Sequence, residues 1–533
     1  MKQYQSSDIR NFSIVGHGDS GKTCLSEAML KLGGEINRLG TIEDGSTTSD
    51  YHPGEKARQI SIHATPLHME WMEKKFNLID TPGYSDFIGE ATGALSVVDL
   101  ALITIHAVNG VEVGTETMWN QATKLGIPKI LVVNGLDREH TRFDEILAQA
   151  RRRFGNNVFP MMFPVNAGLN YNQNVDVLRT ELITYQTDGS GKMTEGELPD
   201  ELIEKVKALH QELIEYVAES DDSLLEKFFE EGSLSEEEMR SGIHEAIQNQ
   251  TFVPLFCTSA TSNIGVARVC DFISKYGSSP DDRKSVTAHD EQGNEVQILL
   301  DGNDSVLQIF KTMAEAHSGE LSLFRVYSGM VKTGNDFYNT DRNAHERIGQ
   351  MFILNGKNKT QVDALYAGDI ASAVKLKNTH MGNTLCSGKH VKLPSMNLPN
   401  PNIHAAIVPT AKGDEEKLAI GLATLHEEDP TFIYRVDSEV KQTIISGQGE
   451  LHLTVTTERL KRRFGIDIEL EKPKVPYRET ILRNGAAKYR YKKQSGGAGQ
   501  FAEVWMKIEP TQRGDGIDSD SNTQLTLPTT NSV

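Results

Sequence analysis

The chain has 533 residues, a formal net charge of −19 at pH 7 and 38% hydrophobic residues. Because domains usually contain about 100–200 residues, this length predicts three or four domains, each with a core of its own. No apolar run reaches the ~18 residues of a membrane span, and no signal peptide opens the chain. The four cysteines lack paired metal spacing. We therefore expect a cytoplasmic protein with reduced thiols and no membrane partner.

The first predicted elements are a buried strand at residues 12–15 and a helix that begins after Lys22. Between them lies the segment Gly16-His17-Gly18-Asp19-Ser20-Gly21-Lys22-Thr23. Glycines in this pattern let backbone N–H groups close around phosphate oxygens, and the helix N-terminus adds positive potential. Lys22 can reach the terminal phosphates and Thr23 can ligate Mg²⁺, so the segment predicts a nucleoside triphosphate site.

Cys24 follows this loop directly and belongs to the same candidate nucleotide site. The helix dipole at this position can lower a thiol pKa. Two interpretations follow: a reactive thiol that bound nucleotide shields, or a buried and inert one.

A second candidate segment follows a predicted strand at residues 76–79 and reads Asp80-Thr81-Pro82-Gly83-Tyr84. An Asp at a strand end can hold Mg²⁺ through water, and Gly83 lets a backbone N–H approach the γ-phosphate. The segment therefore predicts the part of the site that senses the γ-phosphate.

A third segment, at the end of a predicted strand at residues 129–133, reads Asn134-Gly135-Leu136-Asp137. A carboxylate at Asp137 can accept two hydrogen bonds from the N1 and N2 edge of guanine, and adenine offers no such donor pair. A strand at residues 252–257 then leads into Thr258-Ser259-Ala260, whose backbone can meet guanine O6. In this order after a phosphate loop, the segments predict a guanine nucleotide.

Five segments in this order, GHGDSGKT, IDTPGYSDF, AVNGVEVGTETMWNQA, NGLDR and TSA, resemble the translational GTPases of the elongation factor G type. The resemblance continues through FRVYSGMVKTG, ERIGQMF and AGDIASAVKLKNT between residues 324 and 379. It extends further through EEDPTF, SGQGELHL, KPKVPYRETI and KKQSGGAGQFAEVW between residues 427 and 505. It covers roughly residues 8 to 510.

The resemblance implies an α/β multidomain fold that begins with a P-loop GTPase domain. The expected parts are a GTPase domain at 1–281 with a helical insert at about 156–250, a β-barrel second domain at 285–398, a ferredoxin-like α+β sandwich third domain at 402–478, and the start of an incomplete α+β fourth domain at 479–510. Residues 511–533 are polar, and we expect a disordered tail outside the family pattern.

The resemblance also implies cofactors, partners and site residues. It implies GTP or GDP with Mg²⁺, held by Thr23, by Ser61 and through water by Asp80, and a monovalent cation near Asp19 is a further candidate. The implied partners are the ribosome, through rRNA and ribosomal proteins, and indirectly tRNA and mRNA. We expect a monomer off the ribosome.

The chain departs from the family pattern at three places in the GTPase domain. Tyr84 stands where members usually carry the His that positions the attacking water. The switch segment, usually Arg-Gly-Ile-Thr, reads Arg58-Gln59-Ile60-Ser61, and Gly135 replaces a Lys. The candidate catalytic residues are Tyr84, Lys22, Gly83 and Arg58.

These departures leave two functions open. The first is a GTP-hydrolysing factor that acts in tRNA–mRNA translocation. The second is a GTP-gated ribosome-binding factor, for protection, recycling or regulation, with weak hydrolysis and no translocation. Tyr84 has two interpretations as well, a dipole that positions water or a side chain packed against the hydrophobic gate.

Overall fold

The computed structural model describes residues 2–315, 319–411, 413–477, 481–493, 496 and 499–512. It divides into two compact units, the first with Met1–Val436 and Gln442–Pro473 and the second with Asp437–Lys441 and Lys474–Val533. The predicted disordered tail lies, from residue 513 on, outside the described residues. Within the described ranges, no helix is long and apolar enough to cross a membrane.

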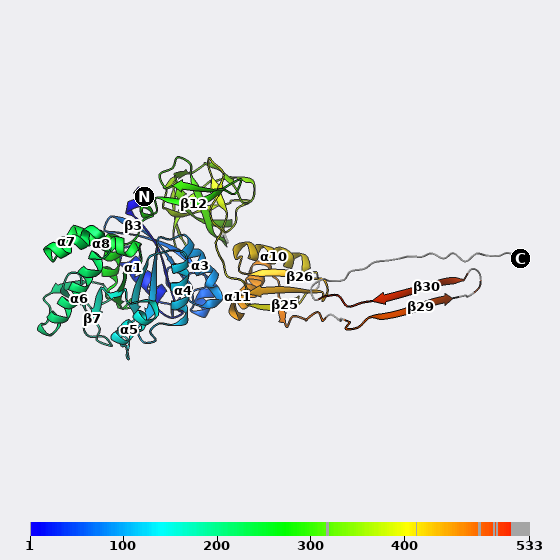
Figure 1. Cartoon of the computed structure of the whole chain (residues 1–533), viewed down its shortest axis with the longest axis horizontal. Coiled ribbons are helices and arrows are strands. Elements are labelled where there is room, and N and C mark those ends of the chain that lie inside the picture. The colour runs from blue at the N-terminus through cyan, green and yellow to red at the C-terminus, as the bar shows by residue number, and fades with distance from the viewer. Residues whose placement is uncertain are drawn as a thin grey trace. The chain divides into compact units, whose positions relative to one another are not determined.

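A seven-stranded sheet forms the centre of the first domain (Figure 1). Its strands in spatial order are β2 (Thr65–Trp71), β3 (Lys74–Asp80), β1 (Ile9–Gly16), β4 (Leu100–His106), β5 (Lys129–Asn134), β11 (Val253–Thr258) and β6 (Val158–Pro160). The edge strand β2 is antiparallel to β3, and the other pairs are parallel. Strands β1, β4, β5 and β11 are buried along their whole length, as parallel strands are when helices cover both faces. The predicted strands at 12–15, 76–79, 129–133 and 252–257 are confirmed.

Helices and short 3₁₀ turns connect these strands. They are η1 (Ser6–Asp8), α1 (Lys22–Leu32), α2 (Pro53–Arg58), η2 (Ser85–Phe87), α3 (Ile88–Ser96), α4 (Val113–Lys124), α5 (Phe143–Phe154), α9 (Val266–Tyr276) and η3 (Pro280–Asp282). The apolar face of α1 is fully buried through Leu25, Ala28 and Met29, as its spacing predicts.

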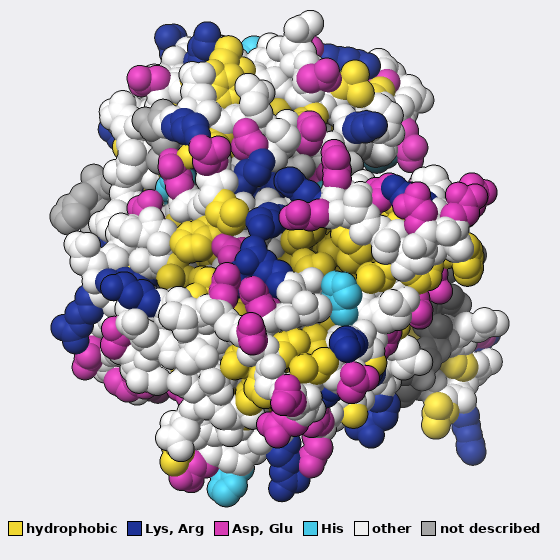
Figure 2. Space-filling view, turned by 90° about the vertical axis from the view of Figure 1, so that its left-hand side faces the viewer, with side chains coloured by type: hydrophobic (Ala, Val, Ile, Leu, Met, Phe, Trp, Pro, Cys, Tyr) yellow, Lys and Arg dark blue, Asp and Glu magenta, His cyan; other side chains and the backbone are white. Residues whose placement is uncertain are grey.

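The insert in this domain contains a sheet as well as helices. Its helices are α6 (Asp200–Ala218), α7 (Asp222–Glu231) and α8 (Glu236–Gln248). Its antiparallel sheet has the order β10 (Met193–Gly196), β9 (Glu181–Tyr185), β8 (Gln173–Asp176) and β7 (Met162–Pro164). Val206, Leu213 and Val217 recur at helical spacing on α6 and are buried, whereas strands of three to five residues are too short for a clear periodic signal. On the face that Figure 2 presents, acidic side chains are interspersed with basic ones.

The second domain is β-rich, as expected. Its largest sheet has the order β18 (Ala344–Arg347), β17 (Asp336–Asn339), β23 (Thr384–Cys386), β14 (Val306–Glu315), β15 (Gly319–Ser328), β22 (Ile370–Val374), β19 (Met351–Asn355) and β20 (Asn358–Val362). Two smaller sheets contain β13 (Glu295–Leu299), β12 (Ser285–Asp290) and β24 (Val391–Lys392), and β16 (Met330–Lys332) with β21 (Ala364–Tyr366). Alternate side chains of β14 and β15, including Leu307, Ile309, Phe324 and Val326, form the core.

The third domain packs two helices on a four-stranded sheet. The sheet has the order β26 (Ile433–Asp437), β27 (Gln442–Gly447), β25 (Ile403–Pro409) and β28 (Ile468–Glu471), and the helices are α10 (Glu415–Glu428) and α11 (Glu450–Phe464). Leu418, Leu422 and Leu425, which recur at helical spacing along α10, lie in its core.

The second unit contains one hairpin, in which β29 (Gly485–Lys493) pairs with β30 (Gln500–Ile508). Most of its side chains are exposed, including Tyr489 and Trp505. The basic and tyrosine-containing run at 488–493 lies on β29.

Buried ion pairs join the first and second domains. Arg325 on β15 donates to Asp99 at 2.8 and 3.0 Å, and Lys75 on β3 contacts Asp369 at 2.5 Å. All four side chains are buried. Removing one partner of such a pair leaves a buried charge without compensation, which costs about 3–5 kcal/mol.

Candidate nucleotide-binding site

The phosphate loop connects β1 to α1 and requires its glycines. Gly16 has φ 146° and Gly21 has φ 83°, which disfavour a side chain. A Cβ at Gly16 would lie 2.5 Å from Thr104 Oγ1, and one at Gly21 would lie 2.2 Å from Asn134 Nδ2. The loop is therefore packed closely against the ends of β4 and β5.

Lys22 lies inside this loop and reaches the second segment of the site. Its Nζ donates to the carbonyl of His17 at 2.6 Å. Burial lowers the pKa of Lys22 to about 8, although the carboxylates of Asp80 and Asp19 raise it. A Cβ at Gly83 would lie 2.2 Å from this Nζ and 2.7 Å from the Gly18 backbone nitrogen. The backbone of Gly83 and the Lys22 ammonium thus lie next to each other, an arrangement in which both can contact one phosphate group.

The three predicted metal ligands come together in one cluster. Thr23 Oγ1 donates to Asp80 Oδ2 at 2.8 Å and lies 3.1 Å from Ser61 Oγ. Ser49 also donates to Asp80 Oδ2, at 2.7 Å. Burial raises the pKa of Asp80, and its hydrogen bonds from Ser49 and Thr23 oppose that shift.

Ser49 and Asp50 are site residues that the sequence pattern did not identify. Burial, together with the charge of Asp80, raises the pKa of Asp50 to about 7. Asp50 Oδ2 and Asp80 Oδ1 are buried and have no hydrogen-bond partner among the described residues. Hydroxyl and carboxylate oxygens are the ligands that Mg²⁺ prefers, so this donor set fits the cation. Only the folded chain reveals it, because Ser49 lies 31 positions from Asp80.

The guanine-recognition segments are tied to each other and to the phosphate loop. Asn134 donates to the carbonyl of Ser20 at 3.2 Å and accepts from the backbone N–H of Ala260 at 2.9 Å. Asp137 Oδ2 accepts from the hydroxyls of Thr261 and Ser262, at 3.1 and 3.0 Å. These bonds hold the Asp137 carboxylate in place.

The backbone N–H groups expected to meet guanine O6 have other partners. Ala260 donates to Asn134, and Ser259 donates to the carbonyl of Ile264 at 3.0 Å. Of the two interpretations of Cys24, the structure favours the inert thiol, because burial raises its pKa to about 11. Desolvation of the thiolate outweighs the helix dipole at this position.

Tyr84 lies over the phosphate loop and is 38% exposed. A Cβ at Gly18 would lie 3.3 Å from its ring, and its Oη donates to Asp19 Oδ2 at 3.5 Å. Burial and the Asp19 carboxylate raise the pKa of the phenol. The ring lines a cavity of about 330 Å³ that is also lined by Gly18, Asp19, Gly83 and Ile88.

Arg58 is the last residue of α2 and Gln59 follows it. The contacts of Arg58 and the backbone of Gln59 both differ from what the family pattern implies for this segment. The Arg58 guanidinium pairs with Glu458 on α11 of the third domain. Gln59 has φ 57°, so a residue with a side chain occupies a left-handed position that favours glycine. The structure therefore brings Ser61 to the metal cluster but pairs Arg58 with the third domain.

Comparisons with known proteins match most of the chain. The matching family models are Elongation factor Tu GTP binding domain at residues 7–279, Elongation factor G domain 2 at 306–388, Elongation Factor G, domain III at 398–472, and Elongation factor G, domain IV at 473–527. The domain IV match reaches beyond residue 510, where we expected the family pattern to end.

A curated relative and a solved structure agree with these matches. The chain is 39% identical over 507 residues to elongation factor G of Salinibacter ruber (strain DSM 13855 / M31), covering 94% of this chain and 72% of the relative. A crystal structure of a protein from Thermus thermophilus has a TM-score of 0.84 at 32% identity, and the match covers 95% of this chain and 73% of that one. The chain therefore belongs to the elongation factor G family and is a translational GTPase that hydrolyses GTP.

Proposed function

We propose that the protein binds GTP with Mg²⁺ at this site and uses hydrolysis on the ribosome for tRNA–mRNA translocation. The observation that carries the proposal is the contact of Thr23 with both Ser61 and Asp80. It joins the phosphate loop, the switch segment and the end of β3. A ligand held by all three can link the state of the γ-phosphate to the position of the switch segment.

The residues of the chain have separate roles in this proposal. Lys22 and the backbone of Gly83 bind the terminal phosphate, and Asp137 selects guanine. Thr23 and Ser61 hold Mg²⁺ directly and Asp80 holds it through water. When bound, Mg²⁺ neutralises charge on the phosphate oxygens. We assign Arg58 no catalytic role, because its guanidinium pairs with Glu458.

The proposed partners and the further cation rest on two other features of the structure. The exposed cationic and aromatic side chains of β29 suit contact with rRNA. A monovalent cation beside Asp19 is part of the proposal, since this residue lines the cavity over the phosphate loop, where its carboxylate accepts from the Tyr84 hydroxyl. We propose a cytoplasmic monomer when the protein is off the ribosome.

One observation favours a second function, a GTP-gated ribosome-binding factor with weak hydrolysis. Tyr84 reaches Asp19 with a phenol, which carries no positive charge at pH 7. If the reaction needs an imidazolium, hydrolysis is slow, and the function of the protein is then GTP-dependent binding to the ribosome.

Phosphate release with and without ribosomes separates the two functions. The first requires strong stimulation by ribosomes and movement of mRNA in a toeprinting assay. GTP-dependent ribosome binding without either result supports the second.

Tyr84→His tests the role of the phenol. If a positioned donor is needed there, we expect the substitution to raise the ribosome-stimulated rate in single-turnover assays, because water must be oriented for attack. Tyr84→Phe is the matched control, since it keeps the ring over Gly18 and removes the hydroxyl. An unchanged or lower rate for Tyr84→His would show that the site is built around the phenol.

A further inference from the structure

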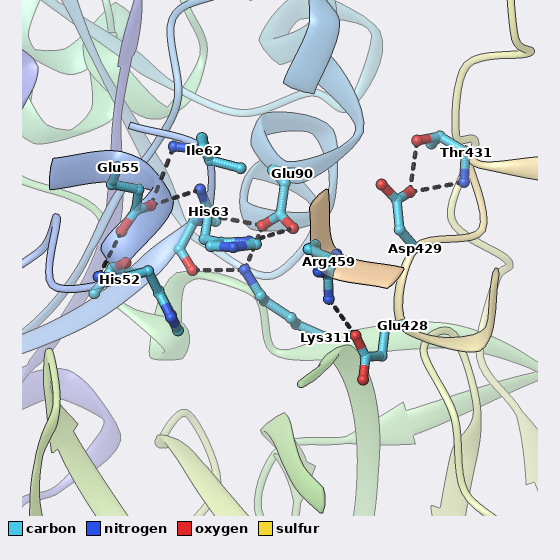
Figure 3. A network of polar contacts seen from close by, with 12 residues as sticks. His52, Glu55, Ile62, His63, Glu90, Lys311, Glu428, Asp429, Thr431 and Arg459 are labelled. Carbon is cyan, nitrogen blue, oxygen red and sulfur yellow. Dashed lines mark hydrogen bonds and ion pairs between the residues drawn. The ribbon is translucent and has the colours of Figure 1, made fainter. Parts of the chain in front are cut away.

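Two carboxylates, one buried and one half-buried, hold the short segment that follows Ser61 (Figure 3). The first is Glu55 on α2. Its Oε1 accepts from the backbone N–H groups of Ile62 and His63, at 3.1 and 3.0 Å, and its Oε2 accepts from that of His52 at 3.1 Å. Glu55 is 0% exposed, and among the described residues no cation forms an ion pair with it. Burial, together with the charge of Asp50, raises the pKa of Glu55 to about 8, and the hydrogen bonds from the backbone N–H groups of His63, Ile62 and His52 oppose that shift.

The second carboxylate is Glu90 on α3, on the other side of the same segment. Its Oε2 accepts from the backbone N–H of Ala64 at 2.7 Å. The ammonium of Lys311, on β14 of the second domain, contacts Glu90 Oε2 and donates to the carbonyl of Ala64 at 3.0 Å. His63 Nδ1 lies 3.6 Å from Glu90 Oε1. Figure 3 shows these side chains converging from three separate segments.

The backbone N–H groups of residues 62, 63 and 64 therefore donate hydrogen bonds to carboxylates from two helices. Ser61, the residue just before them, lies 3.1 Å from Thr23 in the metal cluster. A shift of the segment that withdraws Ser61 would break these hydrogen bonds and leave the buried Glu55 with only one of its three backbone donors, the N–H of His52.

We propose that Glu55 and Glu90 are positioning residues that hold Ser61 in the metal cluster, and that Lys311 couples this arrangement to the second domain. The inference rests on the proposed Mg²⁺ site. It assigns the carboxylates no contact with nucleotide or metal. They act through the backbone of residues 62–64. Lys311 links this segment directly to the second domain through its hydrogen bond to the carbonyl of Ala64.

Glu55→Gln is the principal test. The amide offers one acceptor oxygen in place of two, so it cannot accept from Ile62 and His63 and from His52 at once. We expect hydrogen exchange at the amides of residues 52, 62 and 63 to accelerate ~10–100-fold in the nucleotide-free protein, the change expected when hydrogen bonds to a buried carboxyl group are weakened or lost. We also expect the Mg²⁺ concentration needed for half-maximal binding of a non-hydrolysable GTP analogue to rise ~10-fold or more, with GDP affinity unchanged.

Glu346→Gln is the matched control. Glu346 in the second domain is also buried, at 5% exposed, and accepts from the backbone N–H of Lys377 at 3.0 Å. Its substitution should leave exchange at residues 62–64 and the Mg²⁺ requirement unchanged. Equal effects of both substitutions would overturn the inference, because they would reflect general destabilisation.

A second variant keeps the test decisive if Glu55→Gln does not fold. Lys311→Ala should accelerate exchange at the amide of Ala64, because Glu90, which accepts from that N–H, loses the ammonium that holds it. It should also raise the Mg²⁺ requirement for the GTP analogue. Unchanged exchange at Ala64 would overturn the coupling. If the unmodified protein bound the GTP analogue without Mg²⁺ dependence, the proposed metal site would fail; if it showed that dependence and Glu55→Gln left it unaltered, the positioning role alone would fail.

Discussion

Asn134 and Asp137 are three positions apart at the end of β5, and the structure gives them different roles. Asn134 bonds to Ser20 and Ala260 and so joins the base-recognition segments to the phosphate loop. Asp137 is held by two hydroxyls from the next loop and keeps the carboxylate that guanine requires. Substitution of Asn134 should therefore weaken binding of every nucleotide, whereas substitution of Asp137 should change the preference among them.

Asp137→Asn should shift the preference from guanosine to xanthosine nucleotides. The amide can donate to the oxygen at C2 of xanthine, where the carboxylate accepts from the N2 amino group of guanine. Calorimetric titration with GDP and with xanthosine diphosphate measures the change. Asp144→Asn, an exposed position on α5, is the control and should keep the preference for GDP. Retention of GDP preference by Asp137→Asn would contradict the assigned role.

Gln59→Gly should stabilise the protein. A left-handed conformation costs a non-glycine residue about 1–2 kcal/mol, and the extra freedom of glycine in the unfolded chain takes back part of that gain. We expect the free energy of unfolding to rise by ~0.5 kcal/mol. Ala57→Gly, two residues earlier in α2, should lower it by about 1 kcal/mol. Denaturant unfolding of both variants decides the matter, and a fall for Gln59→Gly would show that its side chain contributes more than its backbone costs.

At the scale of elements, the sequence predicts what local patterns determine. The phosphate loop, the strands around it and the stripe of α10 follow from apolar spacing and glycine positions. The contact of Ser49 with Asp80 and the bonds of Glu55 could not be predicted, because they depend on how the segment between α1 and β2 returns to the sheet. The raised pKa of Cys24 has the same origin, since burial is set by tertiary packing.

The contact between α8 and η3 should make stability depend on pH. His244 Nε2 lies 3.0 Å from Asp282 Oδ1, and the hydrogen bond raises the pKa of His244. Burial raises the pKa of Asp282, but the hydrogen bonds from His244 and Ser279, together with the charge of His244, outweigh it and lower that pKa.

The sign follows from both shifts. The His244 contribution is complete below its ordinary pKa of about 6.5 and is lost as pH rises through the raised value; that of Asp282 is complete above about 3.8 and is lost as pH falls. Heating midpoints of the wild type and His244→Gln should therefore differ more at about pH 5.5 than at about pH 8.5. A difference that grows with pH would contradict this assignment.

At the scale of the whole molecule, every residue of the candidate site belongs to the first unit, as do the cores of its three domains. The hairpin of β29 and β30 belongs to the second. Nucleotide binding and the function of the hairpin should therefore be separable by deletion.

A chain that ends at Pro473 should bind GDP with unchanged affinity. The deletion removes none of the contacts around Lys22, Asp80 or Asp137. Titration of both chains with a fluorescent GDP analogue measures this, and ribosome binding by the shortened chain shows what the second unit adds. Loss of GDP binding in a shortened chain that remains folded would show that the second unit supports the site.

Two of the ion pairs between the first and second domains are fully buried and have opposite polarity. The first domain presents Asp99 to Arg325, and it presents Lys75 to Asp369. A half-turn of one domain against the other would bring Arg325 to Lys75 and Asp369 to Asp99, so the charges select one docking orientation. A chimera that takes its second domain from a relative should fold only if that domain carries the charges that match Asp99 and Lys75. Reversing the charge of one residue in a pair should prevent docking, and exchanging both residues of that pair should restore it.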